Sequence, residues 1–244
     1  MSANADIVAA RPAREVPVAP LLFAGSLALY VATALATGQH AYLTGEGFVG
    51  LTQRMVALGI VALGQTLVIL VGSIDLSVAN LISVSAVLAS FIMKGEPAMI
   101  APAVLAVLAL SAAVGLVNGL IIARLDVNPL IATLGVGLIL QGLLSASFTN
   151  FAGSVPSAFQ VFAYGRIGPL PWSVLLLFVL AFAIWLLLTR TRFGAHLYAT
   201  GGNRDGARLA GIRTERVMIG AHVLCSLMAG LTGLYLASRL KSGS

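Results

Sequence analysis

Long apolar stretches, separated by short polar segments, make up most of this sequence. Stretches without a charged residue run over 16–45, 55–74, 76–93, 97–123, 127–165, 167–189 and 217–238. A helix needs about 20 apolar residues to cross the hydrocarbon core of a membrane, and every stretch is at or near that length. The period-two alternation of a membrane-spanning strand is absent. Because only helices and closed barrels satisfy backbone hydrogen bonds in lipid, we predict an all-α integral membrane protein.

We predict about seven transmembrane helices, at 17–38, 55–73, 76–93, 98–123, 129–148, 171–189 and 217–238. With a cytoplasmic N-terminus, nine Lys and Arg residues lie inside and five outside, which agrees with the positive-inside bias of short loops. The first stretch is too long for the apolar region of a signal peptide, so we expect an uncleaved helix. Residues 1–15 then form a cytoplasmic tail, and residues 16–244 form a single transmembrane domain of a multi-pass protein.

Charge is concentrated in one predicted inner loop, residues 190–216, although only 9% of the chain is charged. This loop holds six of the 14 Lys and Arg residues. Inside it, the sequence Gly201-Gly202-Asn203 is a turn signal. Residues 203–209 can then form a short helix that has Asn203 as its N-cap and closes near Gly211.

The short helix would expose three charged side chains, Arg204, Asp205 and Arg208. The residues alone leave two interpretations open: a docking surface for a cytoplasmic partner, or a solvated basic loop. The net charge of +6 comes from residues that flank membrane spans, and no run of basic residues is interleaved with exposed aromatic residues. The charge therefore indicates membrane topology, and we expect no nucleic-acid partner.

A second polar segment, GSIDLSVAN at 72–80, interrupts apolar sequence and leaves little room for an ordinary loop. We therefore expect a tight turn or a helix that breaks at membrane depth. Asp75 is the only acidic residue between positions 55 and 93. Three interpretations stay open for it: a cap, together with Ser77, for the helix that follows; part of a permeation path; or a hydrated cytoplasmic turn.

Two amide side chains lie within predicted spans. Asn118 falls between Gly115 and Gly119, and small residues four positions apart allow helices to approach closely. We expect Asn118 and Gln65 to act in helix packing, with the lining of a polar translocation path as the alternative. Cys225 in the last span is expected to be a packing residue.

The residues offer no catalytic arrangement. His40, His196 and His222 do not have the spacing of a metal site, and no Ser-His-Asp or Cys-His arrangement can be defended. The phosphate-binding pattern G-x-x-x-x-G-K-[ST] is also absent. We therefore expect no enzyme activity, metal or cofactor on this chain, and any ATP hydrolysis must come from another chain.

Three blocks in the same order carry a resemblance to a known family: GQTLVILVGSIDLSVANLISVSAV, NGLIIARLDVNPLIATLGVGLILQGL and TRFGAHLYATGGNRDGARLAGI. They resemble the ribose-type permeases of ABC importers, which commonly carry simple sugars. The resemblance covers residues from about 50 to 240 and implies an ABC importer permease fold in a bacterial plasma membrane. It further implies four partners besides membrane lipid: an ABC ATP-binding subunit that holds ATP and Mg, a second permease copy, an extracytoplasmic solute-binding protein and a monosaccharide substrate.

The resemblance also assigns the inner loop 190–216 to contact with the ATPase. The residues that match the family block there are Gly201, Gly202, Asn203, Ala207, Arg208 and Gly211. This assignment favours the docking surface over the solvated loop.

Two departures from the family pattern qualify these implications. Ala79 stands where the family has a glycine. The chain stops at LASRLKSGS, where family members continue with a glycine-rich block and several more spans, so the permease fold is expected to be incomplete. A truncated, non-transporting membrane scaffold or remnant is therefore the alternative function. A secondary transporter fits less well because Asp75 has few ionisable companions within the spans.

Overall fold

The computed structural model describes residues 18–147 and 153–242. The predicted tail at 1–15 lies outside the described residues. The chain divides into two compact units, Met1–Phe48 and Val49–Ser244. The expectation of a single domain from residue 16 onward stays a prediction.

The first unit contains a transmembrane-type helix and its connection. Helix α1 (Val18–Ala36) is followed by the short helix η1 (His40–Leu43) and by the first residues of α2 (Gly45–Leu70). The hydroxyl of Tyr30 donates a hydrogen bond to the carbonyl oxygen of Tyr42 at 2.9 Å. The ring centroids of Tyr30 and Phe48 lie 6.2 Å apart, so an aromatic contact joins α1 to the start of α2.

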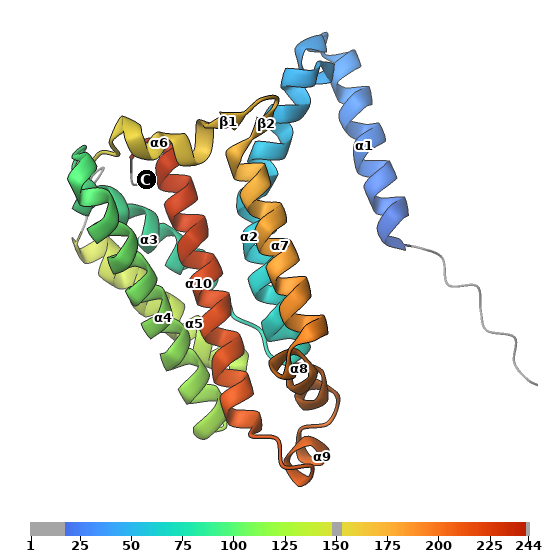
Figure 1. The fold of residues 1–244 in the computed structure, drawn as a ribbon, viewed down its shortest axis with the longest axis vertical. Coiled ribbons are helices and arrows are strands. Elements are labelled where there is room, and N and C mark those ends of the chain that lie inside the picture. The colour runs from blue at the N-terminus through green and yellow to red at the C-terminus, as the bar shows by residue number, and fades with distance from the viewer. Residues whose placement is uncertain (1–17, 148–152, 243–244) are drawn as a thin grey trace, which may run out of the picture. The chain divides into compact units, whose positions relative to one another are not determined.

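The second unit contains the rest of the chain and is a helical bundle (Figure 1). Its elements after α2 are α3 (Val78–Met93), η2 (Pro97–Met99), α4 (Ile100–Arg124), α5 (Pro129–Ser147), α6 (Ser157–Tyr164), β1 (Arg166–Ile167), β2 (Leu170–Pro171), α7 (Trp172–Arg190), α8 (Arg192–Gly202), α9 (Arg204–Leu209) and α10 (Thr214–Leu240). Helices α8 and α9 lie at one end of the bundle, here called the α9 end, and α6 lies at the other, the α6 end.

The seven predicted apolar helices are confirmed. Five helices are long and apolar enough to cross a membrane, at 45–70, 97–124, 129–147, 172–190 and 214–240, and two shorter apolar helices cover 20–36 and 78–93. The largest difference from the sequence prediction is α2, which begins at Gly45 and not at residue 55. Polar residues such as Glu46 and Arg54 ended the predicted span, but a helix continues through them because its backbone bonds are internal.

The bundle is built around α10. Two thirds of the apolar window of α10 is buried, against 11–28% for the other four long helices. Helix α10 packs mainly on α4 and α3. A Cβ added to Gly115 would come within 2.6 Å of the His222 carbonyl oxygen, and one added to Gly119 within 2.7 Å of the Ile219 Cα. The predicted close approach of helices at this glycine pair is therefore confirmed.

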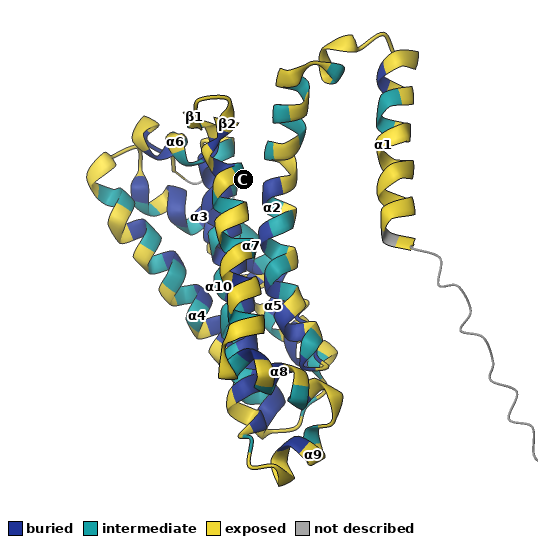
Figure 2. Ribbon diagram, turned by 45° about the vertical axis from the view of Figure 1, so that its right-hand side comes forward, coloured by how far each residue is buried: buried dark blue, intermediate teal, exposed yellow. Residues whose placement is uncertain are grey.

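Large apolar side chains on α5 and α7 remain exposed, including Leu134, Leu138, Phe178 and Phe182. Figure 2 shows buried residues where the helices of the second unit face one another and exposed residues on their outward faces. Outward apolar faces of this kind fit a lipid environment, in which apolar surface need not be covered by protein.

The segment between α5 and α7 is more ordered than the loop that the sequence suggested. Residues 148–152 lie outside the described residues, but α6 and the antiparallel pair β1–β2 form in the remainder. Ser238 of α10 holds α6 in place: its hydroxyl accepts from the Ala163 N–H at 3.1 Å and donates to the Phe159 carbonyl at 2.8 Å.

Candidate functional site

The candidate site is the non-helical segment between α2 and α3. Helix α2 ends at Leu70 and is closed by Gly72, whose φ of 75° is left-handed. The Ser73 N–H bonds to the Val68 carbonyl and the Gly72 N–H to the Ile69 carbonyl, both at 3.0 Å. These two bonds are the Schellman pattern that ends a helix at a glycine. The chain then passes through Ile74 to Ser77 before α3 begins at Val78.

This break lies inside the apolar part of the bundle. The segment contacts Asn118, six residues before the end of α4, and His222, eight residues after the start of α10. At 1.5 Å per residue, these positions are about 9 and 12 Å from the helix ends. Helix α3 has 16 residues and is about 24 Å long, shorter than a full span. The prediction of a helix that breaks at membrane depth agrees with this geometry.

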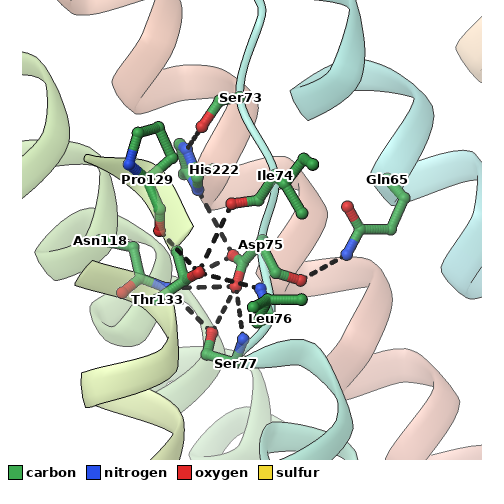
Figure 3. A network of polar contacts seen from close by, with 10 residues as sticks. All are labelled: Gln65, Ser73, Ile74, Asp75, Leu76, Ser77, Asn118, Pro129, Thr133 and His222. Atoms are coloured by element: carbon green, nitrogen blue, oxygen red, sulfur yellow. Dashed lines mark hydrogen bonds and ion pairs between the residues drawn. The ribbon is translucent and has the colours of Figure 1, made fainter. Parts of the chain in front are cut away.

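The carboxylate of Asp75 is the centre of the polar contacts in Figure 3. Its Oδ1 accepts from the backbone N–H of Ser77 at 2.9 Å and from the Ser77 hydroxyl at 2.6 Å. Asn118 Nδ2 lies 3.3 Å from Oδ2, and His222 Nδ1 lies 3.4 Å from the same oxygen. Asp75, Ser77, Asn118 and His222 are all buried. A buried carboxylate is costly unless its oxygens are hydrogen-bonded, and Asp75 has donors from Ser77, Asn118 and His222.

The arrangement fixes the orientation of His222. Its Nε2 lies 3.0 Å from the Ser73 hydroxyl oxygen, on the opposite side of the ring from Asp75. A carboxylate only accepts hydrogen bonds, so a neutral His222 carries its proton on Nδ1 and accepts from Ser73 at Nε2. His222 thus joins both ends of the segment 73–75 to α10.

Two further helices hold the backbone of the segment. The Thr133 hydroxyl of α5 accepts from the Leu76 N–H at 3.0 Å and donates to the Pro129 carbonyl at 2.8 Å. The Gln65 side chain of α2 donates from Nε2 to the Asp75 carbonyl oxygen at 2.5 Å. The break is therefore fixed by four helices: α2, α4, α5 and α10. We call Ser73, Asp75, Ser77, Asn118, Thr133, His222 and Gln65 the polar network.

The polar network borders a cavity of about 470 Å³ between α2, α3 and α10. Arg54, Gln65, Asp75 and Thr232 are the polar residues of a lining that is otherwise largely apolar. Gln65 Oε1 and Asn118 Oδ1 are buried and have no protein partner in the structure. A buried polar oxygen without a partner is costly, and of these two residues only Gln65 lines the cavity.

The structure brings together the four residues that the sequence singled out within the spans: Gln65, Asp75, Ser77 and Asn118. Their functional roles stay predictions. Two details differ from the expectations. Asp75 is only 1% exposed, so it does not lie in a hydrated turn. The Ser77 hydroxyl donates to Asp75 and does not accept a backbone N–H, so Asp75 alone caps the start of α3.

Sequence reasoning missed His222, Ser73 and Thr133 as members of the network. A signal existed for His222, because it is an ionisable residue in an apolar span, and such residues usually have a partner within the membrane. Asp75 was the obvious candidate for that partner. Ser73 and Thr133 carried no comparable signal, since isolated hydroxyl residues are common in membrane helices.

The charged segment 190–216 has the local structure that the sequence predicted. Helix α9 begins after Asn203, whose side-chain Oδ1 accepts from the Gly206 N–H at 2.8 Å. It ends at Leu209 and is closed by Gly211, which has a φ of 83°. The Ile212 N–H bonds to the Ala207 carbonyl at 3.0 Å, and the Gly211 N–H bonds to the Arg208 carbonyl at 2.9 Å. The predicted N-cap and glycine closure are both confirmed.

Contacts tie this segment to the bundle. Gly201 lies so close to the Leu70 carbonyl at the end of α2 that a Cβ would overlap it. Arg204 extends from α9 to the α4–α5 turn, where it meets Asp126 Oδ1 and the Ala123 carbonyl, each at 3.3 Å. Arg204 is therefore only partly exposed, unlike the prediction, because it forms a tether to α4. Asp205 and Arg208 are exposed as predicted, and Ala207 is buried.

Within residues 18–147 and 153–242, His, Cys, Asp and Glu side chains form no group of three that could hold a metal ion. The site chemistry that the described residues offer is hydrogen bonding and charge. The buried thiol of Cys225 belongs to the apolar core next to the network.

Comparison with known proteins gives consistent matches. The family described as branched-chain amino acid transport system / permease component matches residues 47–244. The ribose import permease protein RbsC of Escherichia coli (strain K12) is 36% identical over 207 residues, which cover 82% of this chain and 64% of that protein. No solved structure gives a significant match to the chain.

Two other relatives are named for different sugars. The galactose/methyl galactoside import permease protein MglC of Haemophilus influenzae is 31% identical over 80% of this chain and 63% of its own length. The L-arabinose ABC transporter permease protein AraH of Azospirillum brasilense is 34% identical over 83% and 60%. The chain thus spans about three fifths of the length of the curated relatives that it matches.

Proposed function

This chain belongs to the family of permease components of branched-chain amino acid transport systems, and from that premise we propose that it is the membrane-spanning permease subunit of an ATP-driven importer. We propose a monosaccharide as the substrate. The observation that carries this proposal is the identity of 31–36% to permeases named for ribose, galactose and arabinose import. These names agree on a small polyhydroxylated solute, although they differ in the sugar.

The proposed partners follow from the same assignment: an ATP-binding subunit with its ATP and Mg, a second permease copy and an extracytoplasmic solute-binding protein. In this arrangement the α9 end faces the cytoplasm in a bacterial plasma membrane, and so does the N-terminus. The six arginines of residues 190–216 support that orientation, because short cytoplasmic loops carry an excess of Lys and Arg.

Helix α9 is the proposed contact with the ATP-binding subunit. It is short, closed at both ends by side-chain and glycine caps, and carries Leu209, which is 91% exposed. An apolar side chain this exposed on a capped helix suits insertion into a groove of a protein partner. The Arg204 tether to α4 and the Gly201 contact with α2 would pass a displacement of α9 into the bundle.

We propose that a displacement of α9 changes the position of the polar network. Asn118 of α4 and His222 of α10 both bind the Asp75 carboxylate, and both helices start or end at the α9 end. A shift of α4 against α10 would therefore move the break at the head of α3, beside the 470 Å³ cavity. ATP would drive import because it favours one of the two arrangements over the other.

A reconstitution tests this function. The full chain is placed in vesicles with the ATP-binding subunit and the solute-binding protein of the same transport system, and uptake of labelled ribose, galactose and arabinose is measured with and without ATP. We expect ATP-dependent uptake of one of these sugars and none with a hydrolysis-deficient ATP-binding subunit. Uptake without ATP would indicate a secondary transporter, and ATPase binding without uptake would indicate a membrane scaffold.

A single substitution tests the role of α9. Gly211→Val places a β-branched side chain at a left-handed φ of 83° and should distort the end of the helix. We expect the variant to insert in the membrane while ATP hydrolysis no longer depends on the loaded binding protein. Gly135→Val on α5 is the matched control, because a Cβ there meets nothing within 4 Å and the residue lies outside the loop 190–216. Normal sugar uptake by the Gly211→Val variant, with the ATPase bound, would contradict the assignment.

A further inference from the structure

A second cavity, of about 480 Å³, lies at the α9 end and has a different character from the first. It is formed where the end of α4, the end of α9 and the start of α10 meet. The residues that line it are Arg124, Arg208, Gly211, Ile212, Arg213, Thr214, Glu215, Arg216 and Ile219. We call this cavity the arginine pocket. Four guanidinium groups and one carboxylate give its lining a formal charge of +3.

The charge of the arginine pocket is not neutralised by the protein. In the described part of the chain, none of the four guanidinium groups has a carboxylate within ion-pair distance. Arg208 bonds through Nε to the hydroxyl of the buried Thr214 at 3.1 Å, which leaves its two terminal nitrogens free for another acceptor. Arginine forks of this kind match the paired oxygens of a phosphate. The pocket is therefore suited to an anion that comes from outside the chain.

The position of the arginine pocket indicates which anion it meets. The apolar span of α4 ends at Arg124, and that of α10 begins at Thr214, so the pocket is at the level where membrane helices leave the hydrocarbon core. Ile212 and Ile219 add an apolar part to the lining. A guanidinium cluster beside apolar side chains at this depth fits the phosphate and glycerol of a phospholipid. Two residues of the proposed ATPase contact, Arg208 and Gly211, also line the arginine pocket, whereas the exposed Asp205 and Leu209 of α9 do not.

We propose that the arginine pocket binds the headgroup of an anionic phospholipid. The Arg204 tether holds α9 against the end of α4 and so fixes Arg208 of α9 opposite Arg124 and the start of α10. The bound lipid would link α9 to α4 and α10, which already pack against each other. This inference does not depend on the proposed function, since it concerns lipid binding alone.

The test uses the full chain purified in detergent and titrated with phosphatidylglycerol or with phosphatidylcholine of the same acyl length, with binding followed by native mass spectrometry. We expect selective retention of phosphatidylglycerol. The double variant Arg124→Gln/Arg216→Gln should bind it about 30-fold more weakly, since each basic group near a membrane surface contributes about a five- to sixfold step. Arg124→Lys/Arg216→Lys should recover most of the binding, because it restores both charges.

The matched control is Arg190→Gln/Arg192→Gln, which removes the same charge from the same end of the bundle but from residues that do not line the arginine pocket. We expect this variant to bind within about threefold of the unaltered chain, because contacts outside the pocket are screened. Equal losses in both double variants would assign the binding to diffuse surface charge and overturn the proposal. A thermal unfolding scan shows whether either variant has lost its fold.

Two competition arms separate the source of the anion. Inorganic phosphate that displaces the lipid at equal concentration would show a site for a free anion and overturn the lipid assignment. Displacement by the ATP-binding subunit, with no lipid retained in the complex, would assign the arginine pocket to the protein interface and likewise overturn it. Retention of phosphatidylglycerol in both arms supports the proposal.

Discussion

The polar network and the arginine pocket both place charged groups beside apolar helices, but the two regions differ in whether the chain supplies bonding partners for these groups. The Asp75 carboxylate is buried and bound by Ser77, Asn118 and His222, all from the same chain. The four arginines of the pocket are exposed, and among residues 18–147 and 153–242 only Arg208 of the four has a side-chain hydrogen-bond partner.

The physical reason for this difference is solvent. A charge inside the apolar part of the bundle has no water to bind, so the protein must supply every partner. A charge at the end of the bundle is hydrated and can exchange water for an external ligand at little cost. The first region therefore constrains the fold, while the second is free to bind. Matched substitutions in the two regions test this comparison.

The largest effect is expected for the two aspartates. Asp75→Ala leaves His222, Asn118 and Ser77 without their shared acceptor, and because each buried donor left unsatisfied costs about 1–3 kcal/mol we expect a loss of about 3–5 kcal/mol. Asp205→Ala removes an exposed carboxylate from α9 and should change stability by less than about 0.5 kcal/mol. Thermal unfolding of both variants in the same detergent measures the difference. Equal destabilisation would show that the network does not hold the bundle.

Substitution of the buried His222 should cost more stability than substitution of His196. This difference should be smaller than the one between the two aspartates. His222→Ala removes the link between α10 and both Ser73 and Asp75, and we expect a loss of about 2–3 kcal/mol. His196→Ala, on the partly exposed α8, should cost well under 1 kcal/mol. Chemical denaturation followed by fluorescence reports both values.

His222→Asn refines the histidine test. Its amide can donate to Asp75 but cannot also reach Ser73 with the same geometry, so it should recover only part of the loss. Full recovery would mean that the bond between His222 and Ser73 contributes nothing.

A glycine pair tests packing separately from polarity. Gly115→Ala forces a methyl group against the backbone of α10 at His222 and Val223, and overpacking of this kind costs about 1–2 kcal/mol. Gly202→Ala meets open space at the α9 end and should be neutral. Thermal unfolding distinguishes them, and a neutral Gly115→Ala variant would contradict the close contact between α4 and α10.

The smallest effect is expected at the cap of α9. Asn203→Ala removes the acceptor for the Gly206 N–H and should cost about 1 kcal/mol of local stability. Asn203→Asp keeps that acceptor and should be close to neutral. Amide hydrogen exchange of residues 203–209 is the suitable measurement, because α9 can open without unfolding the bundle. Unchanged amide exchange in the Asn203→Ala variant would show that the Asn203 cap does not stabilise α9.

The sequence by itself determined the features that depend on neighbouring residues. The apolar helices could be predicted because crossing a membrane requires a certain length of apolar chain. Helix α9 could be placed to within a residue because an Asn cap and a glycine closure act within one turn of the backbone. The break near Asp75 was visible for the same local reason, since a charge and a glycine interrupt an apolar run.

Only the tertiary structure decided which helix faces meet. His222 and Asp75 are separated by 147 positions, and their contact depends on how α10 is rotated and shifted against α3 and α4. The Arg204 tether over 78 positions and the assembly of the arginine pocket depend on the same packing. Apolar helices have nearly uniform surfaces, so periodicity does not specify their partners. Close contacts at residues such as Gly115 do, and these depend on shape in three dimensions.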